Sequence, residues 1–260
     1  MLQCHGKVMN MDSCAVNGFF SSAQIEKYCA AVHERRSVRA FKGDPDIGQM
    51  SALHYAAARV ALPGVRIVLG EAPADALYRR LPLVEHIHGS RRYAAVIADE
   101  RIPHAAIHAG ISGEAFILEA VALGVGTCWV AAFKRGGVNV PVEEGEKVKA
   151  VIALGVPAGE GGSRKRKRLS EICASDPASW PFWAYNAAEY VRVAPSAVNL
   201  QPWRLSFAEN TLTLSSARAG ANLDMGIAML HMTLGARDQR HMMRWGEGKE
   251  IASLIAEDKP

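Results

Sequence analysis

The stretch Ala194-Pro195-Ser196-Ala197-Val198-Asn199-Leu200-Gln201-Pro202-Trp203 lies three-quarters of the way along a chain of 260 residues. Its two prolines fix the backbone φ angle and remove two N–H donors. Between them, Ser196, Asn199 and Gln201 carry hydroxyl and amide groups that both donate and accept hydrogen bonds. A rigid frame of such groups suits the edge of a heteroaromatic ring that presents N–H and C=O together. Any one of these residues alone is better explained by a helix end with an Asn turn before the predicted strand 203–207, but the whole string is not.

A group of arginines lies about 160 residues earlier, in Glu34-Arg35-Arg36-Ser37-Val38-Arg39-Ala40-Phe41. It follows a predicted helix that begins at Ser21, where Ser21 and Gln24 form a capping box. Guanidinium groups bind phosphate through paired hydrogen bonds and the serine adds a hydroxyl, so the cluster suits a phosphate group. A solvated basic helix end, which the helix dipole also favours, explains the charges equally well.

A long apolar segment, Gly110 to Leu123, predicts a core helix that ends at the turn Gly124-Val125-Gly126-Thr127-Cys128-Trp129. Because glycine has no Cβ, the backbone at Gly124 and Gly126 can approach a planar ligand closely. Cys128 could be a nucleophile, but no base partner is recognisable. Packing of a small buried side chain is therefore the simpler interpretation.

Five consecutive cations, Arg164-Lys165-Arg166-Lys167-Arg168, follow a glycine-rich segment. Such a run can bind nucleic acid or serve as a nuclear-localisation signal, and more often it is simply solvated. The net charge of the whole chain is only +4, which by itself indicates neither a nucleic acid nor a membrane as partner. We expect neither.

Together, the four segments resemble the motifs of the FMN-dependent nitroreductase family: Pro-Ser-x-x-Asn-x-Gln-Pro-Trp, Arg-Arg-Ser-x-Arg-x-Phe, Leu-Gly-Leu-Gly-Thr-Cys-Trp and Arg-Lys-Pro-Leu-x-Glu. The resemblance implies tightly bound FMN, whose phosphate and ribityl chain the arginines hold. Arg168 replaces the proline of the family pattern, so which cation of that run turns inward stays open. The implied cofactor-binding residues are Arg35, Arg36, Ser37, Arg39, Gly126, Thr127, Cys128, Trp129, Arg166, Arg168, Pro195, Ser196, Asn199 and Gln201. No catalytic side chain is implied, because the flavin carries the chemistry.

The order of the motifs differs from the family pattern, in which the proline-framed motif comes soon after the arginines. At that place the chain reads Ala61-Leu62-Pro63-Gly64-Val65-Arg66-Ile67-Val68-Leu69, without the Ser, Asn, Gln and Trp. The later part of the chain repeats the earlier part in reduced form, since Gly226 to Ala236 parallels Gly110 to Ala120 with four identical positions. That later part keeps the proline-framed motif and lacks the arginines, so the two losses complement each other.

The resemblance therefore implies an α+β fold of the nitroreductase type, built from two tandem half-copies. Each half would be a mostly antiparallel sheet packed by helices, and together they would imitate the dimer of the family as a pseudo-dimer. We expect an N-terminal extension over residues 1–20, a first half over 21–175 and a shortened second half over 176–260. One FMN per chain and a self-sufficient monomer follow, because fusion holds the second half at a high effective concentration. Further oligomerisation stays open.

Periodicity predicts the other elements. An amphipathic helix is expected over roughly Gly48 to Val60, and a helix over Trp180 to Val193. Buried strands are expected over 93–98 and 148–156, and a short strand over 211–214 after a turn at Glu209-Asn210.

Composition and spacing exclude several classes of protein. A chain that is 49% hydrophobic and 22% charged is typical of a soluble globular protein. Its five cysteines include no Cys-x-x-Cys pair, no signal-like run opens the chain, and no apolar run of membrane-spanning length is apparent, so we expect a cytoplasmic protein. His86 and His88 lack further ligands at a recognisable spacing, so no metal site is expected. No Gly-x-Gly-x-x-Gly follows a strand, so NAD(P)H would bind only transiently.

The resemblance implies an oxidoreductase that takes electrons from NAD(P)H through the flavin to a small electron-poor acceptor, such as a nitroaromatic or a quinone. Amide and hydroxyl groups with nearby arginines would stabilise the anionic reduced flavin. A flavin-binding storage or redox-sensing protein without significant turnover is the alternative, because the loss of a second site makes partial loss of function conceivable. A nucleic-acid binder that uses the run Arg164–Arg168 is a third class.

Overall fold

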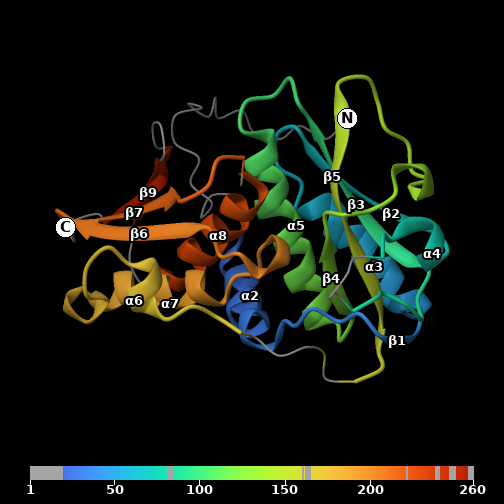
Figure 1. The fold of residues 1–260 in the computed structure, drawn as a ribbon, viewed down its shortest axis with the longest axis horizontal. Helices are drawn as coiled ribbons and strands as arrows, with labels where there is room; N and C mark the ends of the chain where they lie inside the picture. Colours follow the sequence, from blue (N-terminus) through green and yellow to red (C-terminus); the bar gives the residue numbers. More distant parts are fainter. Residues whose placement is uncertain are drawn as a thin grey trace.

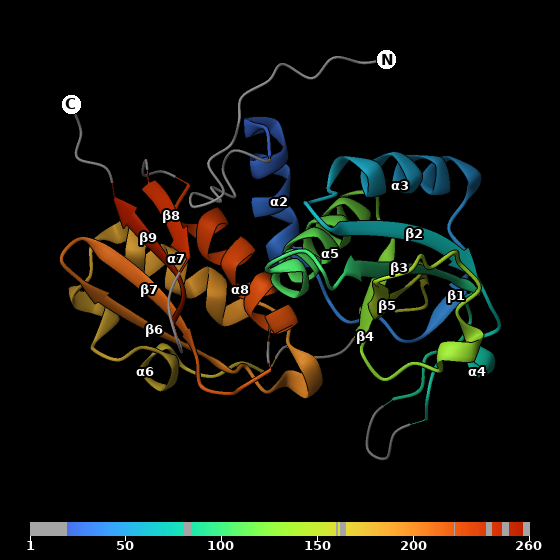
Figure 2. The same ribbon diagram turned by 90° about the horizontal axis from the view of Figure 1, so that it is seen from above.

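The computed structural model describes residues 20–80, 85–159, 161, 165–220, 222–237, 241–245 and 250–256. Two β-sheets stand apart, with helices between them (Figures 1 and 2). The larger unit contains α2 (Ser22–Glu34), β1 (Phe41–Gly43), α3 (Ile47–Arg59), β2 (Val65–Glu71), α4 (Ala74–Leu77), β3 (Arg92–Asp99), α5 (Ala105–Ala122), β4 (Gly126–Val130) and β5 (Glu146–Pro157). The smaller unit contains α6 (Leu169–Ile172), α7 (Phe182–Val193), β6 (Trp203–Ala208), β7 (Thr211–Ser216), α8 (Asn222–Gly235), β8 (His241–Trp245) and β9 (Glu250–Ala256).

The first sheet is antiparallel throughout, in the order β1-β5-β3-β2, with β4 also pairing with β5. Its central strand β3 is buried on both faces. Because successive side chains of a strand point to opposite faces, Ala94 and Val96 join the core shared with the central helices. Tyr93 and Ile97 join a second cluster on the other face. This double burial explains why the segment is almost continuously apolar.

The second sheet is also antiparallel, in the order β6-β7-β9-β8. Its connections repeat those of the first sheet: β6, β7, β8 and β9 take the places of β2, β3, β4 and β5. In both units the long helix, α5 or α8, lies in the chain between the second and third of these strands. The α+β class with antiparallel sheets is confirmed. The shared order of strands is what a tandem duplication would produce, although the pseudo-dimer itself stays a prediction.

The helices α5 and α8 lie between the two sheets (Figure 2), and two glycines bring their backbones into contact. A Cβ on Gly110 would lie 2.1 Å from the carbonyl oxygen of Leu223, and a Cβ on Gly226 would lie 2.0 Å from that of Ile107. The two contacts are equivalent, because residues 107 and 110 correspond to residues 223 and 226 at the same interval of 116 positions. Reciprocal contacts of this kind are characteristic of a two-fold interface.

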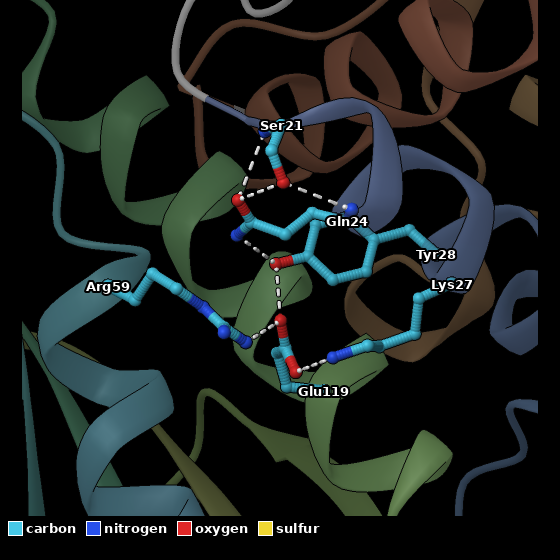
Figure 3. A network of polar contacts seen from close by, with 6 residues as sticks. All are labelled: Ser21, Gln24, Lys27, Tyr28, Arg59 and Glu119. Atoms are coloured by element: carbon cyan, nitrogen blue, oxygen red, sulfur yellow. Dashed lines mark hydrogen bonds and ion pairs between the residues drawn. The ribbon is translucent and has the colours of Figure 1, made fainter.

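The buried carboxylate of Glu119 on α5 ties α2 and α3 to the central helices (Figure 3). The Tyr28 hydroxyl donates to Oε1 of Glu119 at 2.9 Å, and the Lys27 ammonium lies 3.0 Å from Oε2. The Arg59 guanidinium donates to the same carboxylate from α3. The amide of Gln24 donates to the Tyr28 oxygen at 3.2 Å, which links the network to the capping box at the start of α2.

Replacing Glu119 with glutamine should therefore lower the free energy of unfolding by about 2 kcal/mol, the scale of a hydrogen bond to a charged group. Gln keeps the size of the side chain but removes the charge that Lys27 and Arg59 share. Urea unfolding measures the effect, and Glu26→Gln on the exposed side of α2 serves as the control. A midpoint equal to that of the wild type would contradict this account.

The structure confirms most of the predicted elements. The capping box of Ser21 and Gln24 is present, and the Glu209-Asn210 turn has both residues at positive φ. The expected N-terminal extension lies outside the described residues except for Phe20. The sequence was expected to contain no apolar run of membrane-spanning length, but α5 is long and apolar enough to cross a membrane by length and composition. It is mostly buried within the fold, as a core helix is.

Candidate functional site

A cleft of about 500 Å³ is lined by residues of both units. This volume lies within the usual range for sites of small molecules and cofactors. Three segments that are far apart in the sequence meet there: the arginine motif, the turn at β4 and the proline-framed motif. Nine of the fourteen predicted cofactor-binding residues line it: Arg35, Ser37, Arg39, Cys128, Trp129, Arg166, Pro195, Ser196 and Asn199.

The arginine motif enters the cleft as an extended segment and not as a helix end. Ser37 forms a parallel bridge with Thr127 of β4, and the Val38 N–H donates to the Thr127 carbonyl at 2.8 Å. Alternate side chains of an extended chain point to one side. Arg35, Ser37 and Arg39 accordingly line the cleft.

Two predicted arginines lie outside the cleft. Arg36 falls on the other side of the extended segment, and its Nη1 donates to the carbonyl oxygens of His33 at 2.8 Å and Glu34 at 3.3 Å. It thus caps the last turn of α2. Arg168 is exposed and pairs with Glu171 at 3.3 Å. Of the cationic run, Lys165 and Arg166 line the cleft, and Arg164 lies outside the described residues.

The turn at β4 contributes side chains to the cleft but not its predicted glycine. Gly126 is not among the lining residues, and a Cβ there would meet Pro157 at 3.0 Å and Phe41 at 3.2 Å. Its lack of a side chain therefore serves packing within the first sheet. Cys128 is buried, and burial raises the pKa of its thiol, which fits the packing interpretation.

The amide groups of the proline-framed motif hold the cationic run in place. Asn199 Oδ1 accepts a hydrogen bond from Arg166 Nη1 at 2.8 Å, and its Nδ2 donates to the Lys165 carbonyl at 3.0 Å. Gln201 is buried outside the lining, and its Oε1 accepts from the Lys167 N–H at 2.8 Å. Asn199 thus positions Arg166 at the cleft wall.

The backbone of this motif is strained. Val198, Asn199 and Gln201 adopt positive φ angles of 42°, 56° and 49°. A β-branched residue at positive φ is a rare conformation that surrounding contacts must hold. Here the Asp224 carboxylate of α8 accepts the Ala197 N–H at 3.0 Å, while the Ser196 hydroxyl accepts the Gln201 N–H at 2.8 Å. Such strain is typical of functional sites.

Two arginines of the cleft, one buried and one half-buried, each have a buried Nε without a hydrogen-bond partner among the described residues. Arg35 is only 2% exposed, and its Nε has no hydrogen-bond partner among the described residues, although Glu114 Oε1 lies 3.6 Å away. The Nε of Arg166 is likewise buried and without such a partner. Burial and the neighbouring charge of Arg35 lower the pKa of Arg166 to about 10. A buried N–H donor without an acceptor is costly, so two such donors on cationic side chains favour an anionic ligand with several acceptor oxygens.

Sequence reasoning missed part of the lining. Tyr78, Arg79, Glu85 and Ile87 follow α4, where no motif is recognisable. Asp224 lies in the first turn of α8, and burial raises the pKa of its carboxyl. Within the described ranges, no group of three or more His, Cys, Asp or Glu side chains could hold a metal ion.

The family model and the solved structures that match this chain agree on one family. The model of the family described as putative TM nitroreductase matches residues 27–236. A putative nitroreductase from Thermotoga maritima is 23% identical, with 89% of this chain and 94% of that chain covered and a TM-score of 0.62. No curated protein matches.

Two further solved structures are described as FMN-bound nitroreductases. The one from Desulfovibrio desulfuricans is 20% identical, with 58% of this chain and 96% of that chain covered and a TM-score of 0.46. The one from Desulfitobacterium hafniense is 15% identical, with 58% and 98% covered and a TM-score of 0.45.

Proposed function

The chain belongs to the putative TM nitroreductase family, and from this premise we propose that it is an FMN-dependent oxidoreductase. It would take electrons from NAD(P)H and pass them to a small electron-poor acceptor, a nitroaromatic or a quinone. The observation that carries the proposal is a pair of arginines at one cleft, the buried Arg35 and the half-buried Arg166, each with a buried Nε that has no hydrogen-bond partner among the described residues.

The residues of the cleft fit FMN. A phosphate would supply acceptor oxygens to Arg35, Arg39 and Arg166, because guanidinium and phosphate groups form strong, charge-assisted hydrogen bonds. The Ser37 and Ser196 hydroxyls line the same cleft and would face a ribityl chain, and Ser196 can still donate its own hydrogen while it accepts the Gln201 N–H. When bound, the flavin supplies the electron transfer, and the protein binds it, orients it and excludes water.

The composite lining supports one FMN per chain in a self-sufficient monomer. The arginines come from the first half and the proline-framed motif from the second, so neither half alone contains the whole cleft. The domain limits of residues 21–175 and 176–260 remain part of this proposal, with the difference that α6 just before the boundary packs against α7 and β6 of the smaller unit. So do a cytoplasmic location and the absence of nucleic-acid and membrane partners.

The test begins with the absorption spectrum of the purified protein and the identity of the flavin released by denaturation. We expect one FMN per chain in a monomer, measured as flavin-to-protein ratio with light scattering. Two flavins per chain, or flavin bound only in a dimer, would contradict this part. Rapid mixing with NADH and NADPH separates an enzyme from a flavin store, because a store would not lose its colour at a catalytic rate.

A matched pair of variants in the cationic run locates the phosphate. Arg166→Ala should weaken FMN binding by about 2 kcal/mol, roughly thirtyfold in Kd, the scale of a charge-assisted hydrogen bond. Arg168→Ala removes an exposed arginine two residues away and should leave Kd unchanged. Titration of the apoprotein with FMN, followed by flavin fluorescence, measures both. Equal effects of the two changes would mean that net charge matters and that the placement of Arg166 does not.

A further inference from the structure

A buried carboxylate–imidazole pair joins the two halves beneath the cleft. Glu114 of α5 and His231 of α8 have fully buried side chains, and Nε2 of His231 lies 3.0 Å from Oε1 of Glu114. Glu114 also contacts two lining residues of the cleft: its Oε2 accepts from the Trp129 indole at 2.7 Å, and its Oε1 lies 3.6 Å from Nε of Arg35. The other imidazole nitrogen, Nδ1, lies 3.0 Å from the carbonyl oxygen of Tyr190 in α7.

The geometry fixes how many protons the pair holds. A carbonyl oxygen only accepts, so Nδ1 of His231 must carry a proton. A second proton must lie between Nε2 and Oε1 of Glu114, because two bare acceptors at 3.0 Å would repel each other. The pair therefore carries two protons and is neutral as a whole, leaving the positive charge of Arg35 uncompensated by it.

The neighbours of Glu114 favour its ionised form. Burial alone would raise the pKa of this carboxyl, but the hydrogen bond from His231 and the charge of Arg35 outweigh burial and lower that pKa. With Glu114 held as a carboxylate, the second proton of the pair lies on the Nε2 side of the 3.0 Å contact.

Packing does not require this pair. The interval of 116 positions that relates the contacts of Gly110 and Gly226 also relates Glu114 to Leu230 and Ala115 to His231. On the other side of the local axis the corresponding residues are thus apolar and fully buried. Because a buried ion pair is often no more stable than such an apolar pair, its presence on the side of the cleft points to a role in the site.

We propose that His231 neutralises Glu114, so that Arg35 stays oriented by the carboxylate while its positive charge remains available to a phosphate group in the cleft. Glu114 and His231 are positioning residues, and the second half contributes to the phosphate site through a histidine as well as through its loop. This inference rests on the proposed function. It predicts a selective effect on phosphate-bearing ligands.

The test compares FMN with riboflavin, which has the same ring and no phosphate. His231→Gln keeps a donor to Glu114 but removes the positive charge. We expect Kd for FMN to rise about tenfold, the scale of one unit charge acting over roughly 10 Å at an effective dielectric of about 20, with Kd for riboflavin unchanged. Glu119→Gln, in the other buried network on the same helix (Figure 3), should change neither affinity.

An equal loss of affinity for both flavins, or no loss for either, would overturn the inference, because a purely structural role does not distinguish the phosphate. Nitrogen NMR of the wild-type protein decides the proton count without any variant: the two contacts of the ring require a proton on both nitrogens of His231. A ring with one N–H overturns the inference whether or not flavin binds. A wild-type protein with two protonated nitrogens and no affinity for either flavin would contradict the proposed function and leave the proton count standing.

Discussion

Arg35→Met should yield a folded protein that loses its flavin during purification. Methionine fills a similar volume but offers no donor to the phosphate, and the loss of one partner of a buried, hydrogen-bonded charge pair typically costs about 2–5 kcal/mol of binding. That corresponds to a rise in Kd of roughly thirtyfold to several thousandfold. The fold should survive, because Glu114 keeps its hydrogen bonds with His231 and Trp129.

Arg36→Met is the matched control for this change. Arg36 is adjacent in the chain and carries the same charge, but its guanidinium bonds to the end of α2 and not to the cleft. It should retain FMN and lose about 1 kcal/mol of stability, as expected for a partly exposed guanidinium that donates to the carbonyl groups of a helix end. If the two variants bind FMN equally well, the extended-segment geometry does not explain cofactor binding.

The contrast between these neighbours shows what the sequence could and could not predict. Density of charge left a phosphate site over residues 35–39 and a solvated helix end equally possible, and the family resemblance predicted the phosphate site. A strand period of two would have separated Arg35 and Arg39 from Arg36, but only the pairing of Ser37 with Thr127 reveals that this segment is extended. That pairing spans 90 positions, so no local pattern encodes it.

The same limit applies to the proline-framed motif. Its residue types predicted a site rich in hydrogen-bonding groups. The sequence did not indicate that Asn199 bonds Lys165 and Arg166, or that Gln201 bonds Lys167. These side chains meet only after the chain has crossed from one sheet to the other.

The buried pair was the hardest feature to predict. Glu114 and His231 each stand in an apolar helix, where the pattern indicates core. Each polar side chain is explained only by its partner, 117 positions away. The strands β8 and β9 were also missed, because a short apolar run at the end of a chain predicts little until a neighbouring strand is known.

Gly226→Ala should be the most destabilising single change in the central helices. The new Cβ would lie 2.0 Å from the backbone carbonyl oxygen of Ile107, and backbone cannot move aside as a flexible side chain can. The helices α5 and α8 must separate, which breaks the packing that joins the two units. Overpacking usually costs about 1–3 kcal/mol and occasionally more, and we expect at least the upper end. Thermal unfolding measures it, with Gly136→Ala as the control, since a Cβ there meets nothing within 4 Å.

The reciprocal contact makes a sharper prediction for the double variant. Gly110→Ala alone should cost about as much as Gly226→Ala, because its Cβ would meet the carbonyl oxygen of Leu223 at 2.1 Å. A Cβ on either glycine also lies within 3.1 Å of the Cα of the other, so the separation that accommodates one alanine also makes room for the second. The double variant should therefore be destabilised by clearly less than the sum of the two single variants. If the loss of stability in the double variant equals the sum of the two single losses, the two clashes relax independently. The contact of α5 with α8 at these glycines would then not act as one packing unit that joins the halves.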